Sequence, residues 1–220
     1  MNASYKSKVK KLINLGSACI YPKKTKLPIR EDYLLTGTLE KTNEGYALAK
    51  IATLKLCEYF NKLKNKDFIS IQPANLYGNN DNFDLKSSHV IPALIRKFYE
   101  AKKYDKKYVE IWGSGNSKRE FLYVEDLVEA IYFLLKYKKK IKHAYLNIGS
   151  GEEISIKTLA GIIKKISGYE GRIVFNLMKP DGQTRRIMNC QLINKLGWKS
   201  SINIKQGLNK VYDHYKKNTL

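Results

Sequence analysis

Cysteine is scarce in this sequence: its 220 residues include only Cys19, Cys57 and Cys190. An odd number of cysteines without metal-ligand spacing argues against a disulfide framework or a zinc site, and it predicts free thiols in a cytoplasmic protein. No stretch of the chain approaches the about 20 consecutive apolar residues that a membrane-spanning helix needs. The first ten residues are polar and basic, unlike a secretory signal peptide. We therefore expect neither a membrane partner nor secretion.

Acidic residues are also few. The chain has 20 Asp and Glu against 41 Lys and Arg, which gives a formal net charge of +21. A nucleic-acid-binding protein would gather such charge on one face and interleave it with aromatic side chains. Here the lysines are spread along the chain, in runs no longer than that at 138–140, and arginine is scarce. We therefore predict no nucleic-acid partner, although a basic surface favours a ligand that carries a diphosphate.

A glycine-rich turn of the form G-x-x-G-x-x-G is absent from the sequence. In folds that bind dinucleotides, this turn follows the first strand and holds the pyrophosphate at a helix N-terminus. The two partial candidates, Gly113-x-Gly115 and Gly149-x-Gly151, lie late in the chain and lack the third glycine. We interpret both as turns at strand ends, so these residues predict no complete dinucleotide site of the usual kind.

What the sequence does contain is an alternation of short apolar runs and longer amphipathic stretches. Short apolar runs bounded by Gly, Pro or polar residues are typical of buried strands, and apolar positions three and four apart are typical of helices. Strands that alternate with helices predict an α/β fold with a parallel sheet. The expected strands are 11–15, 68–72, 108–112, 120–123, 144–148 and 173–175, and the expected helices are 3–10, 43–61 with Asn43 as its cap, 89–103, 125–137, 155–166 and 204–215.

Tyr46 and Lys50 are the first candidate site residues. They lie four positions apart in an expected helix, so both side chains project from one face. A tyrosine is a poor acid or base at neutral pH, but a nearby cation favours its phenolate form. The same spacing also occurs on ordinary exposed helix faces, because Tyr and Lys are abundant here. Ser17 follows the expected strand 11–15, at the sheet edge where parallel α/β folds bind ligands.

Six strings run in a consistent order along nearly the whole chain: L-G-S-A-C-I-Y-P (15–22), T-N-E-G-Y-A-L-A-K (42–50), P-A-N-L-Y-G-N-N-D-N-F (73–83), S-H-V-I-P-A-L-I-R-K-F (88–98), W-G-S-G-N-S-K-R-E-F-L-Y-V-E-D-L (112–127) and K-P-D-G (179–182). Together they resemble the short-chain dehydrogenase/reductase superfamily in its extended branch, the NAD-dependent epimerases and dehydratases that modify nucleotide sugars. Within that branch they are most similar to the family of GDP-L-fucose synthases. Six strings in order are a far more specific signal than any single motif.

The resemblance implies a fold and a division into domains. We expect a partial Rossmann-like parallel sheet, from which the first β-α-β half is absent, and a small C-terminal α/β lobe that binds the substrate. Residues 1–88 with 125–150 would be the remainder of the NAD(P)-binding domain. Residues 89–124 with 151–220 would be the nucleotide-sugar-binding lobe. The sequence therefore looks like an N-terminally truncated member of the family.

The resemblance also implies an activity. Members of the family epimerise GDP-4-keto-6-deoxy-D-mannose at C3 and C5 and reduce it at C4 with NADPH, which yields GDP-L-fucose. We expect the same GDP-sugar substrate and the cofactor NADP(H) here, with a homodimer or a complementing N-terminal chain as partner. The alternatives are another nucleotide-sugar epimerase or dehydratase, and a catalytically silent GDP-sugar-binding subunit that a separate N-terminal chain completes.

Individual residues take roles by the same resemblance. Tyr46 would protonate the oxygen at C4, Ser17 would bond that oxygen, and Lys50 would hold the nicotinamide ribose. Cys19 and His89 match the pair that exchanges protons at C3 and C5. Sequence spacing alone would equally fit a small core cysteine at position 19 and a helix-capping or core histidine at position 89. The residues expected to line the cofactor are Leu15, Gly16, Ser17, Ala18, Lys50, Pro73, Ala74, Asn75, Leu76 and His89.

Four further residues match contacts to the GDP-sugar: Lys97, Trp112, Arg119 and Asp181. A guanidinium suits a diphosphate, and an indole suits stacking on a sugar or base. Lys97 stands where the family often has arginine, so it keeps the charge but loses the bidentate fork. Trp112 and Lys97 would equally fit an ordinary strand end and a solvated helix face.

Overall fold

The computed structural model describes residues 1–181 and 185–219. The chain forms two compact units, and each has its own sheet and helices. Unit 1 comprises Met1–Asn75, Glu125–Gly151 and Ile187–Ser201, and unit 2 comprises Leu76–Val124, Glu152–Arg186 and Ile202–Leu220. Within the described ranges, no helix is long and apolar enough to cross a membrane. The α/β class predicted from the sequence is confirmed.

The centre of unit 1 is a three-stranded parallel sheet. Its strands are β1 (Lys11–Leu15), β2 (Asp67–Pro73) and β6 (Tyr145–Ile148), in the order β1-β2-β6. The predicted parallel sheet is therefore confirmed, and β1 has the bounds expected from the sequence. β2 is the central strand, and its apolar residues are buried because helices cover the sheet, as is usual for parallel sheets.

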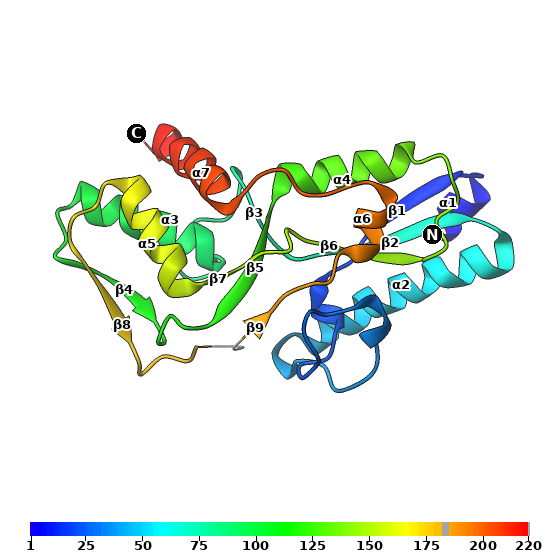
Figure 1. Cartoon of the computed structure of the whole chain (residues 1–220), viewed down its shortest axis with the longest axis horizontal. Helices are drawn as coiled ribbons and strands as arrows, with labels where there is room; N and C mark the ends of the chain where they lie inside the picture. The colour runs from blue at the N-terminus through cyan, green and yellow to red at the C-terminus, as the bar shows by residue number, and fades with distance from the viewer. Residues whose placement is uncertain (182–184, 220) are drawn as a thin grey trace. The chain divides into compact units, whose positions relative to one another are not determined.

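Helices lie on both faces of this sheet. Figure 1 shows α2 (Glu44–Lys64) and α4 (Val124–Lys136) on opposite faces. Phe68 of β2 packs against Cys57 and Phe60 of α2. On the other side, Lys11 Nζ donates to the carbonyl of Leu134 in α4 at 3.0 Å. The shorter helices of this unit are α1 (Asn2–Lys6), α6 (Gln191–Leu196) and three 3₁₀ turns, η1 (Ala18–Ile20), η2 (Glu31–Tyr33) and η3 (Lys41–Asn43).

The segment 187–201 joins unit 1 through backbone pairing with the loop before η2. Ile29 N–H donates to the carbonyl of Ile187 at 2.8 Å, and Asn189 N–H donates to the carbonyl of Ile29 at 2.7 Å. At the other end of the segment, Ser201 N–H donates to Asp126 Oδ1 at 3.0 Å, which fixes it to α4. These bonds give an irregular segment the backbone partners that a buried loop requires.

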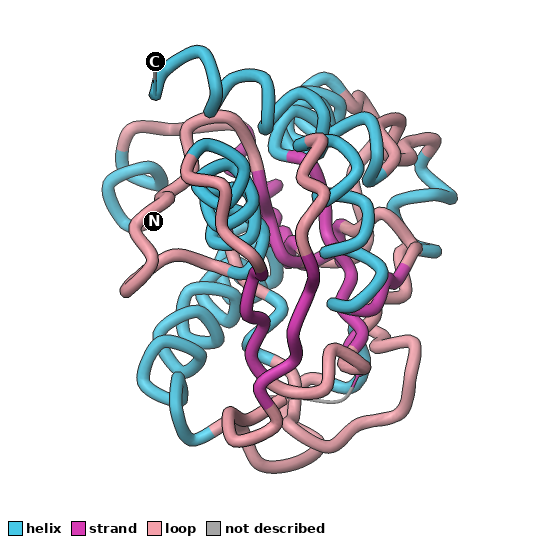
Figure 2. The backbone as a smooth tube through the Cα atoms, turned by 90° about the vertical axis from the view of Figure 1, so that its left-hand side faces the viewer, coloured by secondary structure: helices cyan, strands magenta, loops and turns pink. Residues whose placement is uncertain are grey.

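Unit 2 contains two small sheets. The first has the order β3-β5-β7, with β9 also paired to β5; β5 and β7 are antiparallel. The second is the parallel pair β4–β8, which Figure 2 shows as two neighbouring strands. The strands are β3 (Asn75–Tyr77), β4 (Tyr108–Trp112), β5 (Lys118–Tyr123), β7 (Glu153–Ser155), β8 (Arg172–Asn176) and β9 (Arg185–Arg186).

Three amphipathic helices build the core of unit 2: α3 (Val90–Lys103), α5 (Ile156–Ser167) and α7 (Ile204–Thr219). Their apolar faces meet in one cluster that includes Ile91, Ile95 and Phe98 of α3, Leu159 and Ile163 of α5, and Leu208 and Val211 of α7. All three helices were expected from their apolar periodicity. α3 begins at Val90, one residue after its expected start, and Pro92 lies in its first turn, where proline is tolerated.

Candidate active site

Tyr46 and Lys50 lie together near the N-terminal end of α2. Lys50 Nζ is 5.5 Å from the centroid of the Tyr46 ring and donates to the carbonyl of Leu15 at 2.8 Å. The ammonium is therefore anchored at the C-terminal end of β1, where it can also interact with the phenol face. Tyr46 is 51% exposed, so its hydroxyl can reach a ligand.

Ser17 follows β1 by two residues and is the N-cap of η1. Its N–H donates to Gln72 Oε1 at 2.8 Å, and its Oγ accepts from the N–H of Cys19 at 3.1 Å. Because the Oγ is used there as an acceptor, its own proton stays available for donation to a ligand oxygen. The backbone and the hydroxyl of Ser17 are thus both held in place.

Gln72 is a functional candidate that the sequence interpretation missed. It is fully buried in β2, and a Cβ at Gly16 would collide with its amide. Its Nε2 donates to Ser70 Oγ at 2.9 Å, and Ser70 Oγ accepts from Asn14 Nδ2 at 2.8 Å. This chain of polar side chains supports the Gly16–Ser17 backbone from within the sheet. The available signal was two polar residues, Ser70 and Gln72, at alternate positions of a strand expected to be buried.

Cys19 is partly exposed, and its sulfur has one side-chain partner. Asn43 Nδ2 donates to Cys19 Sγ at 3.2 Å. Asn43 occupies the N-cap position of α2, as predicted, but its side chain makes no capping bond to the helix. The prediction that this side chain caps α2 was therefore wrong, because the amide is turned toward the cysteine instead.

The residues expected to line the cofactor in unit 1 share one edge of its sheet. Leu15 ends β1 and is half exposed, and Pro73 ends the adjacent parallel strand β2. Ala74 N–H continues the pairing by donating to the carbonyl of Ile148 at 2.8 Å. Carboxyl ends of parallel strands are where open α/β sheets bind ligands. Gly16 and Ala18 adjoin this edge, Asn75 is the last residue of that unit-1 segment, and Leu76 belongs to unit 2.

His89 lies in unit 2, at the N-cap position of α3. Its side chain is exposed and makes no capping bond to the helix. The imidazole is therefore not committed to the capping role that the sequence left open. Its ring nitrogens are available to exchange a proton with a ligand.

Trp112 and two lysines form a basic aromatic cluster in unit 2. Trp112 ends β4 and is 58% exposed. Lys97 Nζ lies 6.0 Å and Lys179 Nζ 5.2 Å from its ring. Lys97 also donates to the carbonyl of Glu110 at 3.0 Å, and burial lowers its pKa. The sequence interpretation named Trp112 and Lys97 but not Lys179 as site residues.

Asp181 is engaged by the turn that follows β4. Its two carboxylate oxygens accept from the N–H of Ser114 at 2.7 Å and from Ser114 Oγ at 2.9 Å. Gly113 has φ +75° and no room for a Cβ, which would collide with the Asp181 side chain. The carboxylate therefore holds this turn in shape. Gly182, the last residue of the K-P-D-G string, lies outside the described residues.

Arg119 and Arg186 place two positive charges near each other in unit 2. The residues are register partners on the parallel strands β5 and β9. Burial and the neighbouring Arg186 lower the pKa of Arg119, and the negative charge of Asp181 partly opposes this effect. Two adjacent guanidinium groups are suited to a dianionic ligand such as a diphosphate.

Known proteins are similar to this sequence over nearly its full length. The profile of the NAD dependent epimerase/dehydratase family matches residues 1–149. The chain is 50% identical over 218 residues to a GDP-L-fucose synthase of Sinorhizobium fredii, covering 99% of this chain and 69% of the relative. It is 46% identical over 220 residues to a putative GDP-L-fucose synthase of Arabidopsis thaliana, covering 100% of this chain and 66% of the relative. The chain thus spans about two thirds of the length of these relatives.

A solved structure shows the same arrangement of the backbone. The GDP-L-fucose synthetase of Naegleria fowleri, determined with NADP bound, superposes with a TM-score of 0.90 at 28% identity, covering 99% of this chain and 67% of that chain. The sequence and fold similarities therefore extend over both units. On the family profile and the identity to these relatives, the chain belongs to the NAD dependent epimerase/dehydratase family.

Proposed function

We propose that this chain performs the chemistry of a GDP-L-fucose synthase: epimerisation of GDP-4-keto-6-deoxy-D-mannose at C3 and C5, and reduction at C4 with NADPH. The observation that carries the proposal is the grouping of Ser17, Tyr46 and Lys50 at the C-terminal end of β1. Lys50 is fixed between the Leu15 carbonyl and the Tyr46 ring, and Ser17 is fixed by Gln72. The identity of 50% to a GDP-L-fucose synthase supports the choice of reaction.

The residues present at this edge fit the nicotinamide ribose end of NADPH. Lys50 has three N–H donors and gives one to Leu15, which leaves donors for ribose hydroxyls. The exposed Leu15 side chain offers apolar surface beside the backbone of 16–18 and 73–75. When bound, NADPH supplies the hydride for C4. Tyr46 then donates its proton to the oxygen that becomes an alkoxide, while Ser17 Oγ donates a hydrogen bond to the same oxygen.

Proton exchange at C3 and C5 precedes reduction. The C4 ketone acidifies the protons on both neighbouring carbons. Exchange at C3 and C5 therefore requires only a base and an acid placed beside those carbons. We assign Cys19 and His89 to these roles. Cys19 is partly exposed, and its sulfur accepts a hydrogen bond from Asn43. The His89 side chain is exposed and makes no capping bond to α3.

We assign the GDP moiety to unit 2. Trp112 offers an exposed indole for stacking, with Lys97 and Lys179 beside it. The paired guanidinium groups of Arg119 and Arg186 suit the diphosphate. Asp181 then contributes by shaping the turn after Trp112.

We also propose that the protein acts in the cytoplasm, where cysteines that form no disulfide are stable.

We further propose that two copies associate through α2. Exposed apolar side chains mark one side of α2: Leu48, Leu56, Tyr59 and Leu63. They repeat at helical spacing and lie away from the positions that pack on the sheet.

The test of the proposed function is a pair of titrations followed by a variant. NADPH and GDP are titrated separately into the purified chain, with saturable binding of both expected. Tyr46→Phe should lower C4 reduction by about a hundredfold or more, because it removes the proton donor, while GDP binding stays within twofold. GDP binding without NADPH binding would contradict reductase activity of this chain, and equal loss of reduction and GDP binding would show that Tyr46 is structural.

A further inference from the structure

Asn43 is placed to serve the sulfur of Cys19 rather than the helix that it precedes. It stands at the N-cap of the 21-residue helix α2, where an asparagine side chain usually accepts from a backbone N–H two or three residues later. No such bond forms. Instead the Nδ2 donates to Cys19 Sγ at 3.2 Å, and Oδ1 is buried without a hydrogen-bond partner among the described residues.

The backbone of Cys19 is also held in place. Cys19 N–H donates to Ser17 Oγ, and η1 packs its buried Ile20 into unit 1. The backbone of Cys19 therefore has a fixed position relative to Asn43. The other two cysteines, Cys57 and Cys190, are buried, whereas Cys19 is partly exposed.

A carboxamide can match both protonation states of a thiol. A thiolate only accepts, so it needs the N–H donors of Nδ2, whereas a thiol can donate its S–H to Oδ1. A half-turn about the terminal side-chain torsion exchanges the two atoms with little movement of the rest of the group. The orientation observed presents the donor to the sulfur and leaves the acceptor buried and unpaired. That orphaned oxygen is the group that an S–H would satisfy after the half-turn.

We propose that Asn43 is a positioning residue for Cys19. Its amide supports the Cys19 thiolate, which takes a proton from carbon, and also the thiol that results. The inference rests on the proposed function, because only proton exchange requires the sulfur to alternate between these states. During each exchange a C–H bond breaks, the proton forms S–H on Cys19, and the sulfur returns to thiolate when it gives the proton up. The amide of Asn43 turns once in each direction.

The decisive variant is Asn43→Asp, with Asn43→Ala beside it. Asp has the shape of Asn and is an equally good N-cap, so a merely structural role predicts that Asp is tolerated. Asp at position 43 cannot donate a hydrogen bond to the Cys19 sulfur, because a carboxylate has no N–H, and its negative charge repels a thiolate. Far-ultraviolet circular dichroism of both variants verifies folding.

The first readout is the rate at which iodoacetamide alkylates Cys19 at neutral pH, followed by mass spectrometry of its peptide. The buried Cys57 and Cys190 are internal references. We expect Asn43→Asp to slow alkylation by about tenfold, since a hydrogen bond to a charged group is lost, and Asn43→Ala to slow it less. A rate for Asn43→Asp within twofold of the parent chain would overturn the proposal.

The second readout separates this inference from the proposed function. Deuterium uptake from D₂O at C3 and C5 of the 4-keto sugar is compared with C4 reduction of an already epimerised substrate. Asn43→Asp should lower the ratio of exchange to reduction by about tenfold; an unchanged ratio would count against Asn43. If the parent chain exchanges nothing, the proposed function fails, while the alkylation rates still decide whether Asn43 supports the sulfur.

Discussion

Glu31 is a buried carboxyl that the proposed chemistry does not use. It is 9% exposed, and one of its oxygens accepts from the N–H of Asn147 at 2.9 Å. Burial raises its pKa above the usual value, and the backbone bonds and His143 only partly oppose this. A pKa that is raised in the folded state means that the folded chain holds the proton more tightly than the unfolded chain. The resulting stability is complete below the unfolded-state pKa and is lost as pH rises through the folded-state pKa.

Glu31→Gln should therefore gain stability relative to the parent chain as the pH rises. The amide keeps an oxygen for Asn147 N–H but carries no charge at any pH. We expect the difference in the free energy of unfolding to shift in favour of Gln between about pH 4 and pH 7, measured by urea denaturation. Exposed Glu170→Gln is the matched control for the loss of one negative charge. A difference that does not change with pH would show that the Glu31 carboxyl is not destabilised by its burial.

The sequence could predict the site residues that lie close together in one helix or directly after a recognisable strand. Tyr46 and Lys50 are four apart in one helix, and Ser17 follows a recognisable strand. Gln72 escaped prediction because its neighbour Gly16 follows a different strand, β1. Their contact depends on the register that pairs Ile71 with Leu15, and no local pattern encodes that register.

At the scale of elements, one side chain joins α2 to β2. Ser70 N–H donates to the carbonyl of Ala144, so this residue of β2 faces β6. Phe68 is two residues earlier in β2, so its backbone N–H and C=O point to the same side as those of Ser70. At Phe68, however, β2 has no partner in β6, because the pairing with β6 starts at Ser70. There Asn61 of α2 takes the place of a strand: its Nδ2 donates to the carbonyl of Phe68 at 2.7 Å, and its Oδ1 accepts from Phe68 N–H at 2.8 Å.

Asn61→Ala should lower the free energy of unfolding by about 2–4 kcal/mol, because it leaves a buried N–H and a buried C=O without partners. The measurement is urea denaturation followed by circular dichroism. Asn209→Ala is the control: it removes an exposed asparagine that makes a single bond within α7, and a loss of no more than about 0.5 kcal/mol is expected. Equal losses in the two variants would contradict the idea that Asn61 substitutes for a strand.

Elements with a clear apolar run or period were predictable, and elements without one were not. β1 and β4 have their expected bounds, and α3, α5 and α7 follow clear apolar periods. β7, β9, α6 and the 3₁₀ turns are too short to show a period. α2 continues three residues past its expected end at Asn61, because only Asn65, in the left-handed conformation at φ 47°, stops it.

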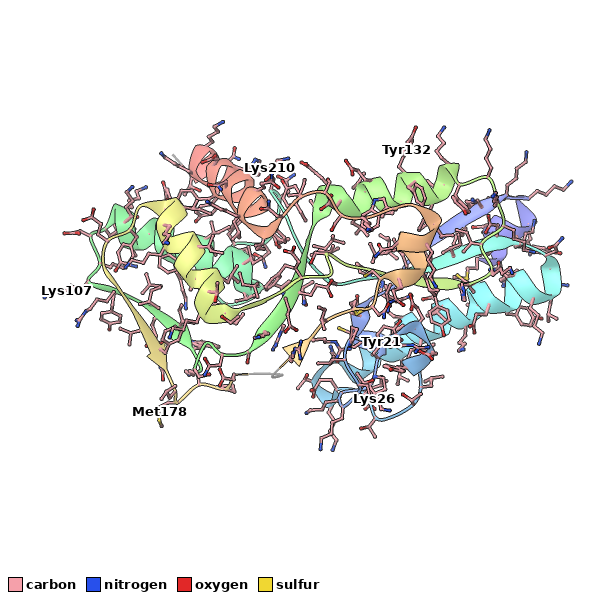
Figure 3. All side chains as sticks on the ribbon, viewed as in Figure 1. Tyr21, Lys26, Lys107, Tyr132, Met178 and Lys210 are labelled. Atoms are coloured by element: carbon pink, nitrogen blue, oxygen red, sulfur yellow. The ribbon has the colours of Figure 1, made fainter. Side chains whose placement is uncertain are left out.

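At the scale of the whole molecule, charge opposes self-association. The formal net charge is +21, and basic side chains are exposed on both units, with Lys26 of unit 1 and Lys107 and Lys210 of unit 2 labelled in Figure 3. Two copies therefore repel each other at low ionic strength, and added salt screens this repulsion. A dimer through α2 should thus be strengthened by salt.

Leu56→Glu should break that dimer. In a two-fold interface each substitution occurs twice, so losing two buried leucines weakens association by about 100-fold or more. The new carboxylate lowers the net charge, so added repulsion would not explain the loss. Tyr132→Glu makes the same change of charge on α4, where Tyr132 is also exposed, and should leave the dimer intact. Sedimentation velocity at low and moderate salt measures both variants, and a dimer that survives Leu56→Glu but dissociates with Tyr132→Glu would move the interface from α2 to α4.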